Sequence, residues 1–98
     1  MGPIRFEWDT AEAESNRRKH GVSFEEARSF FHDEDAVVIP DPEHSADEDR
    51  FVILGTSIEL RVLVVCLCHR SEDETIRIIS ARRANSRERH RYERRDYT

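Results

Sequence analysis

Apolar and polar residues alternate along five short segments of the chain, and elsewhere the apolar residues recur with the wider spacing of amphipathic helices. Alternation with a period of two is typical of strands, and an i, i+3, i+4 spacing is typical of helices. The pattern therefore predicts the element order β-α-α-β-β-β-β-α. The predicted strands span residues 4–8, 36–39, 50–57, 61–69 and 75–81, and the predicted helices span residues 9–20, 23–32 and a stretch from about 86.

Capping residues mark the boundaries of the first two helices. Asp9 is followed by Glu12, and Ser23 is followed by Glu26, which is the spacing of a capping box. Gly21 follows the first helix at the position that favours a left-handed residue. We therefore expect two short helices joined as a hairpin.

The segment 61–69 is the strongest strand candidate, because both of its faces are apolar in the middle. Such a strand needs cover on both sides and belongs in the centre of a sheet. The close spacing of the later strands predicts a small antiparallel sheet with the helices packed on one side. We therefore expect an α+β fold and a single domain over residues 1–98.

Two cysteines lie within this central strand. Cys66 and Cys68 share one face of it, and we expect both to stay reduced and to act as small core hydrophobes. Alternation puts His69 on the opposite face, which does not suit a tetrahedral zinc site. We therefore expect no metal and no other cofactor.

Composition narrows the class of protein. The chain has 98 residues, of which 38% are charged and 37% apolar. Its longest apolar run, residues 62–68, is far shorter than the ~20 residues that cross a bilayer. Residues 1–9 lack the apolar region of a signal peptide. We therefore exclude a membrane protein, a secreted disulfide-rich protein and a multidomain enzyme, and expect a cytoplasmic protein without a membrane partner.

Charge is unevenly distributed. Residues 1–74 hold 18 acids and 8 bases, whereas residues 75–98 hold 8 arginines and 3 acids. An arginine-rich end suits a polyanion or an acidic partner, because the guanidinium is a rigid fork for phosphate or carboxylate. A solvated, highly charged terminal helix is the alternative.

Several arginines lie on or beside predicted strands, where each needs an anionic partner. The acidic loop 41–49 could supply that partner, and a phosphate is the alternative. Metal-free cleavage of RNA requires a base for the 2′-OH, cations around the phosphorane and an acid for the leaving 5′-oxygen. The residues that could fill these roles are Lys19, His20, His44, Glu48, Arg50, Arg61, His69, Arg77 and Arg82.

Four of these residues also have structural interpretations. Lys19 and His20 lie in the last turn of a predicted helix, where cations oppose the helix dipole. Strict alternation puts Arg77 and Arg82 on opposite faces of their strand. Only one of the two would then face a phosphate, unless a bulge near residues 80–81 re-aims the chain.

Three blocks of sequence together resemble the BrnT family of bacterial type II toxins. The resemblance runs from about Phe6 to Glu93. The blocks are Phe6-Glu-Trp-Asp9, Asn16, Lys19-His-Gly-Val22 and Phe24-Glu-Glu-Ala27; then Asp41, His44-Ser45 and Glu48-Asp-Arg50; then Arg77-Ile-Ile-Ser-Ala-Arg82-Arg-Ala84, Glu88-Arg89 and Tyr92-Glu93.

This resemblance implies a RelE-like fold and an activity. Members of the family are metal-independent endoribonucleases that cut RNA and stop translation. The resemblance also implies a cognate BrnA-like antitoxin that neutralises the toxin. Operator DNA would be bound only through that antitoxin, in a complex that represses its own operon.

The matching motifs also imply site residues. Arg50, Arg77 and Arg82 would hold the scissile phosphate, and proton transfer would fall to Lys19, His20 or Glu48. Tyr92 would stack on a base, or else pack on the sheet. The expected additional RNA contacts are Arg61, His69, Arg70 and Tyr92.

The chain departs from the family within its central strand. Relatives read Cys-His-Cys-Tyr-Arg where this chain has Cys66-Leu-Cys-His-Arg70. If the family histidine is catalytic, Leu67 would disable the site unless His69, on the same face, replaces it. A binding module that holds an antitoxin and co-represses DNA without cutting RNA is therefore the alternative function.

Overall fold

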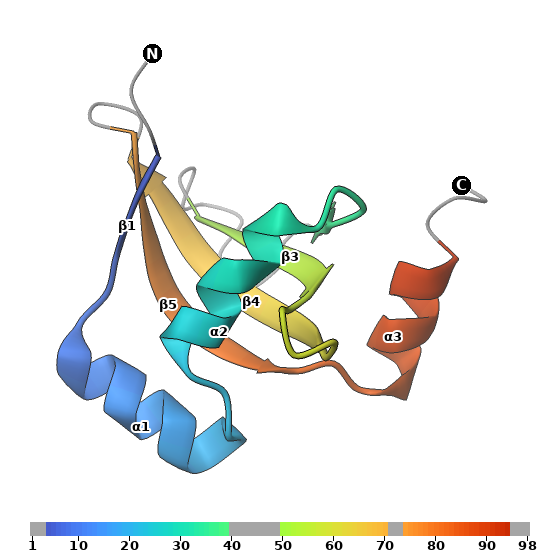
Figure 1. The fold of residues 1–98 in the computed structure, drawn as a ribbon, viewed down its shortest axis with the longest axis horizontal. Coiled ribbons are helices and arrows are strands. Elements are labelled where there is room, and N and C mark those ends of the chain that lie inside the picture. Colours follow the sequence, from blue (N-terminus) through green and yellow to red (C-terminus); the bar gives the residue numbers. More distant parts are fainter. Residues whose placement is uncertain (1–3, 40–49, 71–73, 95–98) are drawn as a thin grey trace.

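The computed structural model describes residues 4–39, 50–70 and 74–94, which form a five-stranded sheet with three helices (Figure 1). The predicted order of elements is confirmed in this part of the chain. None of the helices described is long and apolar enough to cross a membrane. The strands are β1 (Arg5–Glu7), β2 (Val37–Ile39), β3 (Arg50–Thr56), β4 (Val62–Arg70) and β5 (Thr75–Arg83), and the helices are α1 (Thr10–His20), α2 (Phe24–Ser29), the 3-10 turn η1 (Phe30–His32) and α3 (Ser86–Glu93).

The sheet is mixed, with strand order β1-β5-β4-β3-β2. Strands β2 to β5 form the predicted antiparallel meander, but β1 pairs parallel to β5, with Arg5 opposite Thr75 and Glu7 opposite Arg77. The prediction of a purely antiparallel sheet is therefore wrong at β1. Alternation identified this three-residue strand, but alternation carries no information about which strand it joins.

The predicted N-caps of α1 and α2 are confirmed, but not as full capping boxes, since the Glu26 carboxylate binds Arg61 and Ser57 instead. The Asp9 side chain accepts from the amide of Glu12 at 2.9 Å, and Ser23 Oγ accepts from the amide of Glu26 at 3.0 Å. Gly21 ends α1 in the left-handed region, with φ of 68°. Helix α2 lies over one face of the sheet, which we call the helix face, and α1 lies along the edge of β5 beside it (Figure 1).

The main core lies between these helices and the sheet. Leu63, Val65 and Leu67 of β4 point into it and meet Phe24 and Phe30. All five side chains are fully buried. The odd-numbered residues of this stretch of β4 therefore define the helix face, and the even-numbered residues define the opposite one.

Helix α3 packs against the opposite face. Tyr92, 8% exposed, lies in a second cluster with Leu54 and Val64. The prediction that all helices lie on one side is therefore wrong, because a strand that is apolar on both faces needs cover on both. The cover is partial, and Cys66 and Cys68 carry reduced thiols that are half-buried on this face rather than in the main core.

The free edge of β5 is closed by a side chain. β1 pairs with β5 only as far as Arg77, and α1 runs beside the rest of the strand. Asn16, 7% exposed, donates through Nδ2 to the carbonyl of Ala81 at 2.7 Å and accepts from the Ala81 amide at 3.0 Å. The same Nδ2 donates to the carbonyl of Val22 at 3.0 Å. Asn16 therefore replaces the missing strand and holds α1 against β5.

Candidate functional site

An irregularity in β5 decides where its arginines point. Cys66 pairs with Ser80 and Leu67 with Ile78, so Ile79 is an extra residue opposite the junction of Cys66 and Leu67. A bulge of this kind shifts the alternation by one residue. The bulge that would re-aim the chain is therefore present, one or two residues before the expected place.

The bulge brings Arg77 and Arg82 to the same face. Ile78 and Ala81 both belong to the main core, with 0% and 1% exposure. Arg77 precedes Ile78 and Arg82 follows Ala81, so both arginines point away from the helix face. We call this side of the sheet the arginine face.

Arg50 shares the arginine face. It pairs with Cys68 of β4, which in turn pairs with Arg77 of β5. The three residues form one row across the sheet, and at ~4.8 Å per strand the Cα atoms of Arg50 and Arg77 lie about 10 Å apart. Their long side chains can therefore reach a common anion.

Arg77 and Arg82 each have acidic neighbours. Arg77 Nη1 lies 3.4 Å from Glu7 Oε2, and its Nη2 lies 3.8 Å from Glu12 Oε1. Arg82 makes two short hydrogen bonds to Glu88, Nη1 to Oε1 at 2.8 Å and Nη2 to Oε2 at 2.7 Å. These bonds raise the pKa of Arg82 and lower the pKa of Glu88. Arg82 is therefore held firmly and Arg77 loosely.

Lys19 and His20 line a pocket beside the bulge. The pocket measures about 270 Å³ and lies between α1 and β5. Glu12 lines it as well and also contacts Arg77, so the pocket adjoins the arginine face. The full lining comprises Glu12, Ser15, Asn16, Lys19, His20, Ile79 and Ser80.

The structure thus places five of the predicted residues at the pocket or on the arginine face, with Arg82 about 13 Å along the sheet from the row of Arg50 and Arg77, because it pairs with Val64 rather than Cys68. Lys19 and His20 come from the end of α1, Arg77 and Arg82 flank the bulge, and Arg50 lies two strands away. Half-exposed guanidinium groups can hold a phosphate, and an amine or imidazole beside them can move a proton. Glu48 lies outside the described residues.

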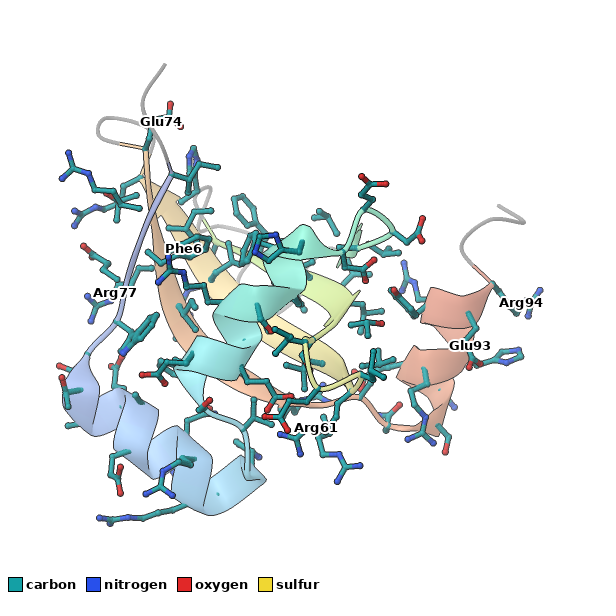
Figure 2. All side chains as sticks on the ribbon, viewed as in Figure 1. Phe6, Arg61, Glu74, Arg77, Glu93 and Arg94 are labelled. Carbon is teal, nitrogen blue, oxygen red and sulfur yellow. The ribbon has the colours of Figure 1, made fainter. Side chains whose placement is uncertain are left out.

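Arg61 lies elsewhere. Its Nε donates to Glu26 Oε2 at 2.9 Å, and its Nη2 donates to Glu26 Oε1. Glu26 is 6% exposed and also accepts from Ser57 Oγ at 2.7 Å. The hydrogen bond from Arg61 lowers the pKa of the Glu26 carboxyl despite its burial. Figure 2 shows Arg61 near the base of α2, well separated from Arg77 beside β1.

The other three predicted RNA contacts are divided between the two faces. His69 points to the helix face, where its ring lies near Phe51 and its Nε2 lies 4.0 Å from Glu74 Oε2. Tyr92 packs on the sheet and donates to Asp33. Arg70 lies on the arginine face, with Nη2 3.5 Å from Glu7 Oε1.

The sequence reasoning missed the acids around these arginines. Glu7 follows Phe6, which packs against the main core. The alternation therefore predicts that Glu7 points away from the helix face. Glu88 follows Asn85 at the spacing of a capping box and was readable in the same way. No sequence pattern marked Glu12 and Ser80 as site residues. They meet at the pocket only because of the bulge in β5 and the docking of α1.

Two observations concern alternative sites. Within the residues described, no three His, Cys, Asp or Glu side chains are grouped so that they could hold a metal ion. A larger pocket, about 360 Å³, lies between η1 and the end of β3, and the described residues that line it include none of the predicted site residues. The lining is Ser29, His32, Asp33, Thr56, Ser57 and Ile58.

Comparisons with known proteins agree with the resemblance in the sequence. Residues 8–88 match a family described as the ribonuclease toxin BrnT of a type II toxin–antitoxin system. The crystal structure of the Brucella abortus ribonuclease toxin BrnT is similar in fold, with a TM-score of 0.66 and 24% sequence identity. The match covers 86% of this chain and 100% of that one. No curated protein gives a significant match.

Proposed function

Because the chain belongs to the BrnT family of ribonuclease toxins of type II toxin–antitoxin systems, we propose that it is an endoribonuclease that cuts RNA without a metal ion. One observation carries the proposal. The bulge in β5 puts Arg77 and Arg82 on one face, beside the pocket that Lys19 and His20 line.

The chemistry needs no group beyond these side chains. The 2′-oxygen of the ribose attacks phosphorus after a base removes its proton, and the bond from phosphorus to the 5′-oxygen breaks as an acid supplies a proton. The products are a 2′,3′-cyclic phosphate and a 5′-hydroxyl. Arg50, Arg77 and Arg82 stabilise the extra negative charge of the phosphorane, and Lys19, His20 or Glu48 exchange the protons.

The proposal includes the partners and setting of a toxin. A type II system implies an antitoxin partner. We propose that a BrnA-like antitoxin neutralises this chain in the cytoplasm, that the complex represses its own operon, and that operator DNA is bound only through the antitoxin. Helices α1 and α2, which contribute to one core on one side of a small sheet, support a RelE-like assignment.

A toxin-fold binding module is the second candidate function. The acids around the arginines favour it, because Glu88 takes both terminal nitrogens of Arg82 and Glu7 and Glu12 flank Arg77. A site so neutralised would hold a protein partner rather than cut RNA. The two functions differ in one measurable property, the cleavage of RNA by the antitoxin-free protein.

The test is RNA cleavage in the presence of EDTA, with three arginine variants of the antitoxin-free protein. We expect the wild type to cut total RNA, and Arg77→Ala and Arg82→Ala to lose at least about tenfold in rate, since each removes a charged contact to the phosphorane. Arg83→Ala is the matched control, because Arg83 pairs with Leu63 on the helix face. Activity that requires added metal would refute the metal-free mechanism, and no activity on free RNA or on translating ribosomes would favour the binding module.

A further inference from the structure

We propose that Glu7 occupies a second phosphate subsite, formed by Arg70 and Arg77. The RNA phosphate next to the scissile one would displace its carboxylate from these arginines. The inference rests on the proposed function and adds a residue that competes with the substrate.

The geometry around Glu7 is that of a small anion held by two cations. Its Oε1 lies 3.5 Å from Arg70 Nη2, and its Oε2 lies 3.4 Å from Arg77 Nη1. Arg70 comes from β4 and Arg77 from β5, so one carboxylate bridges two strands with one oxygen for each. The two unesterified oxygens of an RNA phosphate can make the same pair of contacts.

Among the described residues, four arginines and two acids, Glu7 and Glu12, lie around this part of the arginine face. Arg5 precedes Phe6, a residue of the helix face, and so points the same way as Glu7. It pairs with Thr75, which also pairs with Arg70. Arg50 lies across the sheet in the row of Arg77. Displacing Glu7 therefore releases one terminal nitrogen of Arg70 and one of Arg77 to meet the RNA backbone.

The contacts of Glu7 are loose enough to be exchanged. The side chains of Glu7, Arg70 and Arg77 are 35%, 51% and 38% exposed, and their contacts are long. Exposed ion pairs of this kind contribute little to stability. By contrast, Glu88 holds Arg82 at 2.7 and 2.8 Å. A competing phosphate would therefore open the Glu7 pair before the Glu88 pair.

The subsite also lies next to the reaction centre proposed above. Arg77 contacts Glu7 through Nη1 and Glu12 through Nη2, and Glu12 lines the pocket of Lys19 and His20. One arginine thus lies between the two positions. Phosphates that follow each other along a single strand would meet first the pocket and then the Glu7 subsite.

The test compares Glu7→Gln with Glu14→Gln in binding to an RNA analogue that cannot be cut. Glu14 is a close control, because its carboxylate also contacts two arginines, Arg17 at 2.8 Å and Arg18 at 3.5 Å. It lies on the side of α1 away from the pocket, and both substitutions remove one negative charge. The ligand is an oligonucleotide with 2′-O-methyl groups at every position, which lacks the attacking hydroxyl.

We expect Glu7→Gln to tighten binding about fivefold at low salt, since a charge beside the phosphate is removed. The slope of log K against log salt should steepen by about 0.7 for each arginine that gains a phosphate. Glu14→Gln should change neither quantity by more than its long-range charge effect. Adding Arg70→Gln to Glu7→Gln should cancel the gain.

Other outcomes would overturn the inference. Equal effects of Glu7→Gln and Glu14→Gln would show that no phosphate lies at Glu7, and weaker binding by Glu7→Gln would make Glu7 a structural support. Tighter binding of poly-glutamate but not of RNA would assign the patch to an acidic protein partner. The proposed function is tested separately, since loss of cleavage in Arg77→Ala would stand even if Glu7→Gln changed nothing.

Discussion

Arg82 and Glu88 join the last strand to the last helix through two parallel hydrogen bonds of 2.8 and 2.7 Å. Glu88 also accepts from the backbone amide of Asn85 at 2.9 Å, which completes the capping box of α3. One carboxylate thus starts a helix and fixes the direction of an arginine beside the bulge. The pair links the stability of α3 to the geometry of the proposed site.

Glu88→Gln should make unfolding less sensitive to acid. Glutamine can still complete the capping box, so the substitution removes mainly the charge beside Arg82. Arg82 lowers the pKa of Glu88 below its usual 4.5, so the pair stabilises the fold above that pH and the contribution is lost as the pH falls through the folded-state pKa. We expect the free energy of unfolding at pH 7 to fall by about 1 kcal/mol. Urea unfolding of the wild type and of Glu88→Gln at pH 7 and 3.5 measures both expected changes. If the two proteins lost the same free energy of unfolding between these pH values, the prediction would be contradicted.

Asn16→Ala should be among the more destabilising changes in α1. It leaves the amide and carbonyl of Ala81 and the carbonyl of Val22 without the hydrogen bonds that Asn16 makes with them in a buried place. With about 1 kcal/mol or more for each group, the loss should reach about 3 kcal/mol. Ser15→Ala on the same helix is the control. If urea unfolding gave the two variants similar stabilities, Asn16 would not hold the edge of β5.

Arg61→Gln should lower stability without slowing the cleavage of RNA by folded protein. It removes the guanidinium whose hydrogen bonds hold the buried Glu26 carboxylate and lower its pKa. We expect a loss of about 2 kcal/mol, because breaking one side of a buried pair leaves the other uncompensated. Thermal melting and single-turnover cleavage below the melting range separate the two effects. Slower cleavage at full stability would instead make Arg61 an RNA contact.

The sequence was informative where the signal is local. Caps such as Asp9 and Ser23 depend on residues three positions away, so their helix starts could be predicted. The partner of β1 and the side on which α3 packs depend on contacts between distant segments. Apolar residues on both faces of β4 indicated that both need cover, but not which helix covers which.

The sequence predicted which residues belong to the candidate site, but not how they are arranged. Lys19, His20, Arg77 and Arg82 were recognised by motif, but strict alternation separated the last two. The bulge that brings them to one face contains no glycine and no turn residue that would mark it. Its residues, Ile79 and Ser80, fit a regular strand equally well. Its position is decided by pairing with β4 and by the burial of Ala81 beside Asn16.

Leu67→His should reduce stability and leave cleavage by folded protein unchanged. Leu67 lies where the family resemblance implies a histidine, but it is fully buried on the helix face and pairs with Ile78 and Phe51. An imidazole there loses apolar contacts and places a polar ring in the core, which should cost about 2 kcal/mol or more.

Cys68→His is the matched control, because it adds the same ring one residue later, half-buried between Arg50 and Arg77. Urea unfolding and cleavage in EDTA should show the stability loss only in Leu67→His and an altered rate only in Cys68→His. Faster cleavage by Leu67→His at full stability would place the reaction on the helix face and refute the assignment to the arginine face.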